Sequence, residues 1–494
     1  MNQNKNINKD GNITHKIKRS LELSPEIIKI ESRKRSGRGI NSPLIILYGL
    51  ILFILLGTFL LFLPFSSKNL ENVSLVDSFF VATSAVTVTG LTPFQSEDTW
   101  STFGLSVIMI LSFIGGLGFM MGAGFIIYIF FGRRLNLEQK ILINESLSDA
   151  TPSKIAPGSS IRLVINIFIM SVIFQIIGFI IIYFLWQGKN LGNNYDTLFN
   201  AIFHSISAYN GSGFDILSDS NGGSIGEIKT NSNLLNITMI LILLGSIGYP
   251  FILELFANTK LFLQSKYKEI FFTLNFKVIL LGTILIMVIG SVQFLFSEWT
   301  NIETIAEDNI KEKVIYSIFH SITRTAGFSL IDYNLIHNST TISTLALMFV
   351  GGSSLSVAGG IKIGTLSIIV ISLIATIFGK EEVTIFKRTI SRDITRRALI
   401  IFIFSIFLII FSFIIISSFE PDTIFRELLF ECVSAFGNVG LTTGITGSLN
   451  DFSKVLMSFL MIVGRFGPML LAIMFVGKRN KENAKPAYEI VRIG

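Results

Sequence analysis

Long apolar stretches constrain this chain more than any other feature. Residues 43–63 and 398–416 are each about twenty residues long and contain no charged residue. At a rise of about 1.5 Å per residue, a helix of that length crosses a hydrocarbon layer of roughly 30 Å. Because every backbone N–H and C=O must be hydrogen-bonded within the protein there, the sequence predicts an all-α integral membrane protein.

Composition and charge support this prediction. Of the 494 residues, 50% are hydrophobic and only 15% are charged, with a mean hydropathy of +0.64. Basic connections (residues 133–154, 260–277, 380–397 and 478–492) alternate with connections that lean acidic (residues 71–98, 196–227, 298–308 and 420–422). By the positive-inside rule, both termini are cytoplasmic and the number of spans is even. The net charge of +7 therefore reflects topology, and we expect no nucleic-acid partner.

Four short segments of the chain share one pattern. In each, a Ser is followed six residues later by a Gly and then at once by Leu or Phe: SAVTVTGL (84–91), SAYNGSGF (207–214), SITRTAGF (321–328) and SAFGNVGL (434–441). The glycines Gly90, Gly213, Gly327 and Gly440 lie 123, 114 and 113 residues apart. Such a nearly constant period indicates repeats of one structural unit.

Each copy has the same surroundings. An apolar span and a short helix precede the pattern, and a second span follows it. We therefore predict eight spans in four tandem helix, pore-helix, filter-loop, helix repeats around one pseudo-fourfold pore. The boundaries are a disordered basic cytoplasmic tail (1–42), four repeats (43–135, 136–270, 271–385 and 386–478) and a cytoplasmic C-terminal tail (479–494), with the second helix broken in the third repeat.

The loops of these repeats suit a cation. Irregular backbone within a membrane must be buried in protein or line a watery cavity, so four loops can gather around one axis. Helix C-termini carry partial negative charge and carbonyl oxygens replace the hydration shell of an ion, so no carboxylate is needed. The candidate filter, which we call the four filter loops, comprises Thr87, Val88, Thr89 and Gly90; Asn210, Gly211, Ser212 and Gly213; Arg324, Thr325, Ala326 and Gly327; and Gly437, Asn438, Val439 and Gly440.

These motifs resemble a known family. TVTGL, NGSGF, RTAGF and GNVGL, with GGLGF (115–119) and GRFGP (464–468), are similar to signatures of the Trk, Ktr and plant HKT potassium transporters. The bacterial Ktr membrane subunit is the closer match, because one span precedes the first filter loop. The resemblance implies gated, channel-like K⁺ uptake across the bacterial plasma membrane and no enzyme activity. It also implies a homodimer and a cytoplasmic ring of nucleotide-binding regulatory subunits, with no bound cofactor and Na⁺ as a possible activator.

A glycine-rich segment interrupts the second span of the third repeat. The sequence GGSSLSVAGGIKIGT (351–365) places five glycines where each weakens a helix by about 1 kcal/mol relative to Ala, so the helix should break. A plain kink remains an alternative, whereas a phosphate-binding loop would need a Gly-Lys-Ser/Thr ending. The resemblance implies an intramembrane gate beneath the filter, and the candidate gate residues are Gly351, Gly352, Ser353, Ser354, Ser356, Gly359, Gly360, Lys362 and Arg465.

Two arginines in apolar surroundings need partners. Arg465 in the last span should face the pore or a protein group, because an arginine facing lipid there costs roughly 2.5 to 3.5 kcal/mol. For Arg324 in the third filter loop we expect a guanidinium that points behind the filter and pairs with Glu431.

Other functions remain open from the sequence. A sodium or mixed sodium and potassium transporter would use the same fold, and a secondary transporter with alternating access also uses broken helices. An intramembrane enzyme is a third class, because His204 and His320 lie near serines on short helices. No Ser-Lys, Asp-Asp or His-Glu-x-x-His constellation accompanies these histidines, so we expect them to pack.

Overall fold

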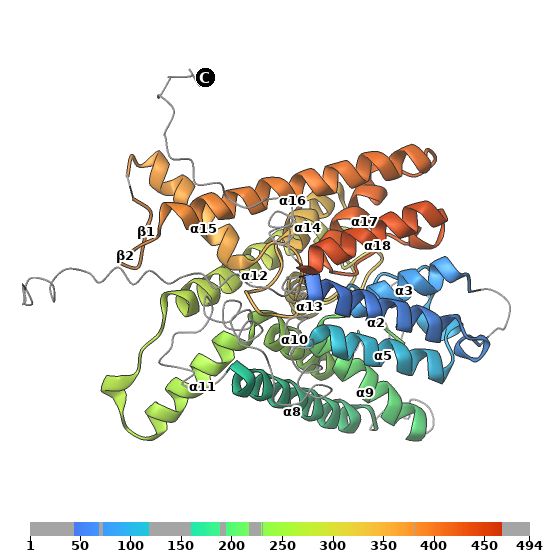
Figure 1. The fold of residues 1–494 in the computed structure, drawn as a ribbon, viewed down its shortest axis with the longest axis horizontal. Coiled ribbons are helices and arrows are strands. Elements are labelled where there is room, and N and C mark those ends of the chain that lie inside the picture. Colours follow the sequence, from blue (N-terminus) through green and yellow to red (C-terminus); the bar gives the residue numbers. More distant parts are fainter. Residues whose placement is uncertain are drawn as a thin grey trace, which may run out of the picture. The chain divides into compact units, whose positions relative to one another are not determined.

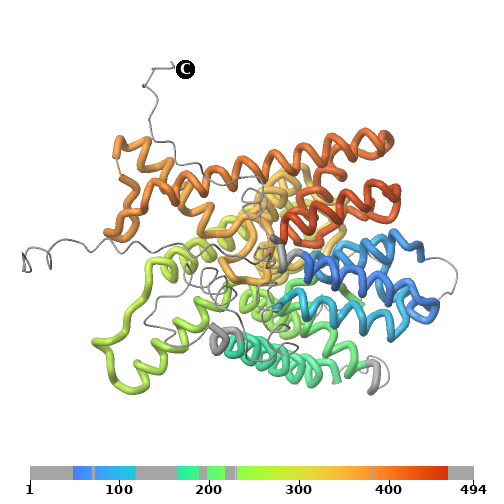
Figure 2. The backbone as a smooth tube through the Cα atoms, viewed as in Figure 1, coloured from blue at the N-terminus to red at the C-terminus, as the bar shows by residue number. Residues whose placement is uncertain are grey.

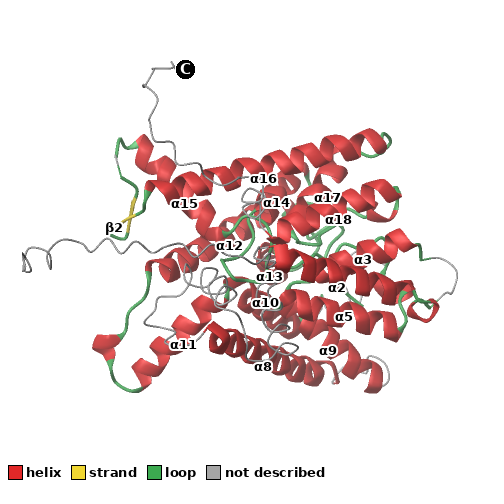
Figure 3. Cartoon of the chain, viewed as in Figure 1, coloured by secondary structure: helices red, strands yellow, loops and turns green. Residues whose placement is uncertain are grey.

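The computed structural model is almost entirely helical where the chain is described (Figure 3). It describes residues 44–68, 73–117, 160–187, 194–216, 229, 231–380 and 382–466, which all belong to one compact unit, residues 43–494. The predicted tails, residues 1–42 and 479–494, lie outside the described residues. The predicted all-α class is confirmed for this part of the chain, apart from a two-stranded hairpin.

A long helix followed by a short one occurs four times along the chain. The long helices are α2 (Leu44–Phe62), α8 (Ser160–Gln187), α12 (Leu274–Glu298) and α16 (Arg392–Phe419). The short helices are α3 (Leu75–Thr87), α9 (Asn194–Asn210), α13 (Ile310–Thr323) and α17 (Phe425–Gly437). Each short helix packs against the long helix that precedes it, and each ends at or just before a filter loop.

The second helix of each unit is interrupted in two of the four cases. α5 (Thr102–Gly116) and α18 (Asp451–Phe466) are continuous as far as they are described. α10 (Ser232–Ile247) bends by 100° into α11 (Tyr249–Leu263) at Gly248, whose φ of +88° and following Pro250 end the first helix. α14 (Asn338–Phe349) and α15 (Ile363–Ile377) are separated by residues 350–362, which we call the connecting loop.

Short elements complete the described residues. They are α4 (Ser96–Thr99), the 3-10 helices η1 (Pro64–Ser66), η3 (Tyr267–Glu269) and η4 (Ile445–Gly447), and the strands β1 (Thr384–Ile385) and β2 (Arg388–Thr389). The strands pair antiparallel, with Thr384 opposite Thr389. Figure 1 shows α11, α15 and this hairpin at the same end of the helices, toward the left of the view.

Three helices among the described residues are long and apolar enough to cross a membrane individually: α8, α12 and α16. The bent pair α10 and α11 meets the same criterion when taken together. The exposed residues of the long helices are mainly Leu, Ile and Phe, for example Leu55, Phe184, Ile289 and Ile403. Large apolar side chains on the outer face are expected where lipid, rather than water, is the solvent.

The helices form a closed cycle of contacts. The second helix of each unit packs on the short helix of the next: α5 on α9, α10 on α13, α14 on α17, and α18 on α3. The last of these contacts returns the end of the described chain to its beginning. Figure 2 shows this closure as the red C-terminal helix beside the blue N-terminal ones.

Polar contacts accompany this cycle at its joints. Lys454 on α18 forms a buried ion pair with Asp77 on α3, with Nζ and Oδ1 2.7 Å apart. Lys229, just before α10, pairs with Asp308, just before α13, at 3.3 Å. The two pairs occupy equivalent places, because in each the Lys precedes or begins a second helix and the Asp precedes or begins the next short helix. The pair at the closing joint is the more buried of the two.

We predict that Lys454→Met lowers the thermal stability of the detergent-solubilised protein. The substitution leaves the Asp77 carboxylate buried without its cationic partner, which typically costs about 3–5 kcal/mol. The measurement is the midpoint of thermal unfolding, with Lys266→Met as the matched control because Lys266 is exposed. The double variant Asp77→Asn/Lys454→Met should regain part of the loss, and an unchanged midpoint in Lys454→Met would show that the ion pair does not hold the cycle closed.

Candidate functional site

Three of the short helices end in the same turn. The amide of the residue before the filter glycine donates to the carbonyl of the repeated serine: Thr89 to Ser84 at 2.8 Å, Ser212 to Ser207 at 2.9 Å, and Val439 to Ser434 at 3.0 Å. In each turn the residue directly before this donor has a left-handed backbone; these residues are Val88, Gly211 and Asn438. This is the Schellman arrangement, which satisfies helix carbonyls while it turns the chain. It accounts for the six-residue spacing from Ser to Gly.

The repeated serine also holds the glycine itself in two loops. The Ser84 hydroxyl accepts from the Gly90 amide at 3.0 Å, and the Ser434 hydroxyl accepts from the Gly440 amide at 3.1 Å. The third loop differs, because Arg324 continues the helical conformation with φ −50° and Gly327 donates to Thr323. The third filter loop therefore differs from the other three in backbone geometry.

The four filter glycines approach one another as a closed ring. Their φ angles are all positive, and a Cβ placed on any of them would overlap a carbonyl oxygen of the next loop. Gly90 faces Ser212, Gly213 faces Ala326, Gly327 faces Val439, and Gly440 faces Thr89. Both the left-handed backbone and the close approach require glycine here. The structure therefore brings together all four segments that the sequence predicted as the filter.

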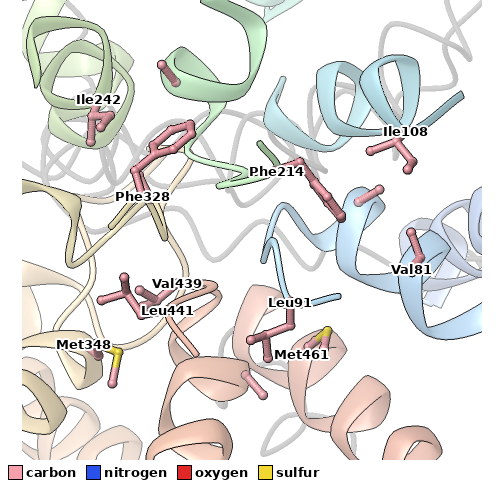
Figure 4. Packing of buried hydrophobic residues seen from close by; sticks show 14 of the residues in the cluster. Val81, Leu91, Ile108, Phe214, Ile242, Phe328, Met348, Val439, Leu441 and Met461 are labelled. Carbon is pink, nitrogen blue, oxygen red and sulfur yellow. The ribbon is translucent and has the colours of Figure 1, made fainter. Parts of the chain in front are cut away.

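One cavity of about 350 Å³ touches all four glycines. The residue after each glycine anchors the loop in the core: Leu91, Phe214, Phe328 and Leu441 are each at most 1% exposed. Figure 4 shows these four side chains coming from four different segments around a common centre. The ring of loops is thus fixed from behind by apolar packing.

The connecting loop after α14 hydrogen-bonds the backbone carbonyls at the end of α10. The end of α10 leaves carbonyls without helical partners, and the connecting loop supplies donors: the Ser353 amide to Ser246 O at 3.0 Å and the Val357 amide to Gly245 O at 3.2 Å. The Ser353 hydroxyl donates to the carbonyl of Ile247. All predicted gate residues other than Arg465 lie in this connecting loop, namely Gly351, Gly352, Ser353, Ser354, Ser356, Gly359, Gly360 and Lys362.

The connecting loop also touches the fourth filter loop. Gly359 packs so closely on the Asn438 side chain that a Cβ there would overlap its amide group. The Asn438 amide nitrogen donates to the Thr89 hydroxyl and to Met461 O, each at 2.8 Å. Asn438 therefore joins the first and fourth filter loops, α18 and the connecting loop.

Arg465 lies between the connecting loop and α5. Its guanidinium donates to Val357 O in the connecting loop and, at 2.5 Å, to Gly115 O near the end of α5. Lys362 donates to Ala358 O within the connecting loop. The prediction that Arg465 faces protein rather than lipid is therefore correct, and its partners are backbone carbonyls.

The predicted Arg324–Glu431 pair is wrong. Arg324 points behind the filter, but its guanidinium donates to Leu347 O at 3.2 Å and to Val350 O. These are carbonyls at the C-terminal end of α14, where the macrodipole favours a cation; Leu347 O also accepts from the Val350 amide at 3.2 Å. Glu431 instead accepts three hydrogen bonds from residues 442–446, which follow the fourth filter loop.

The two histidines considered as catalytic candidates are packed. His204 hydrogen-bonds the Thr238 hydroxyl at 2.9 Å and lies against Phe328, with ring centroids 5.3 Å apart. His320 hydrogen-bonds the Tyr333 hydroxyl at 3.0 Å and stacks on Phe294 at 4.7 Å. Both side chains help to hold short helices in the core.

Comparison with known proteins identifies the family. The family model of the TrkH cation transport proteins matches residues 40–484. The chain belongs to this family. Its membership confirms the resemblance to the Trk and Ktr proteins and places the chain among ion transporters rather than enzymes.

Individual relatives agree with this assignment. The chain is 34% identical to the Ktr system potassium uptake protein B of Bacillus subtilis over 91% of its length and 96% of the relative. It is 33% identical to the potassium/sodium uptake protein NtpJ of Enterococcus hirae over 92% and 97%. The crystal structure of the potassium transporter TrkH from Vibrio parahaemolyticus has the same fold, with a TM-score of 0.66 at 16% identity, covering 90% of this chain and 86% of that one.

The sequence alone left some of these roles unassigned. It marked the repeated serines as a pattern, but the amide acceptor role of Ser84 and Ser434 needed the folded loop. It also gave no partner for Glu431 among residues 442–446. The threonines there were a usable signal, since three hydroxyl residues within five positions can serve one buried carboxylate.

We predict that Arg324→Leu destabilises the protein more than Arg324→Gln does. Leucine removes the guanidinium that donates to Val350 O, whereas glutamine can still supply an N–H, and an unpaired buried polar group costs about 1–3 kcal/mol. The readout is the thermal midpoint in detergent, with Arg396→Gln as the control because Arg396 is an exposed arginine on α16. Equal midpoints for Arg324→Leu and the parent would contradict the capping role.

Proposed function

We propose that this protein carries K⁺ into the cell across the plasma membrane through a channel-like passage formed by the four filter loops. The closed ring of Gly90, Gly213, Gly327 and Gly440 around one cavity is the observation that carries the proposal. In this proposal the cycle of helix contacts corresponds to four tandem repeats with eight spans and a pseudo-fourfold axis. The repeats are residues 43–135, 136–270, 271–385 and 386–478.

The chemistry of the ring supports K⁺ as the substrate ion. Left-handed residues alternate with others in three filter loops, as at Val88 and Gly90 on either side of Thr89. Such alternation can direct successive carbonyl oxygens to one side, where they replace the hydration shell of an ion. The inside-negative potential then contributes roughly 2.3 kcal/mol per charge per 100 mV to uptake.

We infer that the connecting loop is the gate beneath the filter. The inference is supported by its contacts with both the fourth filter loop, through Gly359, and Arg465, through Val357. Two broken helices share their hydrogen bonds in this region, so a local rearrangement can exchange partners without opening the helical scaffold. The positive charge of Arg465 opposes the passage of a cation through a closed loop.

The assembly we propose is the one that the resemblance to the Ktr proteins implies: a homodimer in the bacterial plasma membrane, with cytoplasmic termini and a nucleotide-binding regulatory ring on the cytoplasmic side. The identity to proteins named as parts of a Ktr system supports further components in general. Activation by Na⁺ belongs to the same proposal. A passage for both Na⁺ and K⁺ is a second candidate, favoured by the 33% identity to a protein named for potassium and sodium uptake.

The direct test is growth rescue. A bacterial strain without its own K⁺ uptake systems is given the chain, with and without a Ktr regulatory subunit, and grown at low K⁺. We expect rescue, with the Gly440→Ala variant inactive and the Gly49→Ala variant active, because a Cβ on Gly440 overlaps Thr89 O whereas none lies near Gly49. Absence of rescue, with protein present in the membrane, would favour a Na⁺ transporter.

We predict that Gly90→Ser reduces the preference for K⁺ over Na⁺. A side chain at Gly90 overlaps the Ser212 carbonyl and strains a φ of +92°, so two of the four loops must move apart. The measurement is the ratio of initial K⁺ and Na⁺ uptake rates in cells, with Gly49→Ser as the control. An unchanged ratio would contradict the assignment of this ring as the filter.

A further inference from the structure

Glu431 occupies a position at which the four units differ. It lies nine residues before the filter glycine, where the other units have Val81, His204 and Ile318. Glu431 is fully buried, and burial of a carboxylate is costly unless its oxygens are hydrogen-bonded. An acid found in one unit of four is not required by the shared architecture, so it calls for a reason specific to the fourth unit.

Its partners lie in one short segment just outside the filter. Glu431 Oε1 accepts from the Thr443 amide at 3.1 Å and from the Thr442 hydroxyl, and Oε2 accepts from the Thr446 hydroxyl at 3.0 Å. We call residues 442–446 the outer turn. Charge-assisted hydrogen bonds of this kind are stronger than neutral ones, and three of them converge on one carboxylate.

The corresponding turns elsewhere are held differently. Thr92 lies two residues after Gly90, and its hydroxyl accepts from the Phe94 amide and donates to the Phe94 carbonyl. Ser329 lies two residues after Gly327 and bonds the amide and carbonyl of Ile331 in the same way. In the fourth unit Thr442 likewise accepts from the Gly444 amide, at 2.8 Å, but donates to Glu431. The Thr92 and Ser329 hydroxyls thus bond within their own turns, and in the fourth unit the Thr442 hydroxyl joins the outer turn to Glu431 on α17.

The outer turn also forms part of the cavity above the filter. Thr442, Gly444 and Thr446 line that cavity together with the four filter glycines. A second tie comes from the third unit, where the Asn334 side chain donates to Thr443 O, and Arg426 on α17 donates to Asn334 O at 3.1 Å. The outer turn, which lines this cavity, is thus hydrogen-bonded both by Glu431 of the fourth unit and by Asn334 of the third.

We propose that Glu431 is a positioning residue for the outer mouth: it fixes the outer turn beside Gly440 and so sets how readily external K⁺ enters the filter. The proposal rests on the proposed function as a K⁺ passage. Glu431 does not touch the ion in this account, because its oxygens are occupied by the outer turn. Loss of the carboxylate therefore changes the capture of external K⁺ more than the rate once the ion is bound.

The test compares the concentration dependence of K⁺ uptake in graded variants. Glu431→Ala removes both acceptor oxygens and with them all three hydrogen bonds. Glu431→Gln keeps one carbonyl acceptor, and Thr446→Val removes one donor while it keeps the side-chain shape. We expect KM for external K⁺ to rise on the order of tenfold in Glu431→Ala, which corresponds to about 1.4 kcal/mol, and less in the other two. The maximal rate per protein in the membrane should stay within about twofold of the parent, since the filter glycines are unchanged.

The matched control is Glu427→Gln, which removes the same charge one turn earlier on α17 at a partly exposed position. Its KM should equal that of the parent. An unchanged KM in Glu431→Ala, or an equal fall in maximal rate with KM constant, would overturn the proposal. If Glu431→Ala does not accumulate, Thr446→Val decides, and an unchanged KM there overturns it. Failure of the parent itself to take up K⁺ would contradict the proposed function instead.

Discussion

The constraint on which this structure depends is the backbone carbonyl left unpaired where a helix stops in the protein interior. Helices end there at the filter loops, at Gly248 and at Phe349. Away from the filter, protein groups donate to carbonyls near helix ends: Arg324 at the end of α14, Arg465 to Gly115 O of α5, and the connecting loop at the end of α10. In our account, the carbonyl oxygens of the filter loops coordinate the transported ion instead of a protein donor.

Several differences among the four units lie in the third and fourth. The third filter loop leaves the turn shared by the other three at Arg324, and that arginine caps α14, which is followed by the connecting loop. The fourth loop carries Asn438, which contacts that connecting loop, and Glu431, which holds the outer turn. In our account, one repeated scaffold supplies the ring, and changes in two units supply the features of the proposed gate and outer mouth.

Much of this arrangement could be predicted from the sequence because it follows local patterns. The Ser-to-Gly spacing identified the helix ends, and the glycines of residues 351–365 identified the broken helix. The bend at Gly248 was not predicted, although Gly and Pro flank Tyr249. The prediction of a partner for Arg324 was wrong, because the true partners depend on where α14 ends, more than twenty residues away along the chain. Spacing reveals local turns, whereas the partners of buried charges are set by tertiary contacts.

The central claim is that backbone oxygens of the four filter loops together bind the transported ion. The most direct measurement is anomalous scattering from crystals of the protein grown in Rb⁺, a heavier substitute for K⁺. The account predicts a peak enclosed by the carbonyl oxygens of Thr89, Ser212, Ala326 and Val439. A well-ordered ring without such a peak, with Rb⁺ bound only at carboxylates such as Asp215, would contradict it.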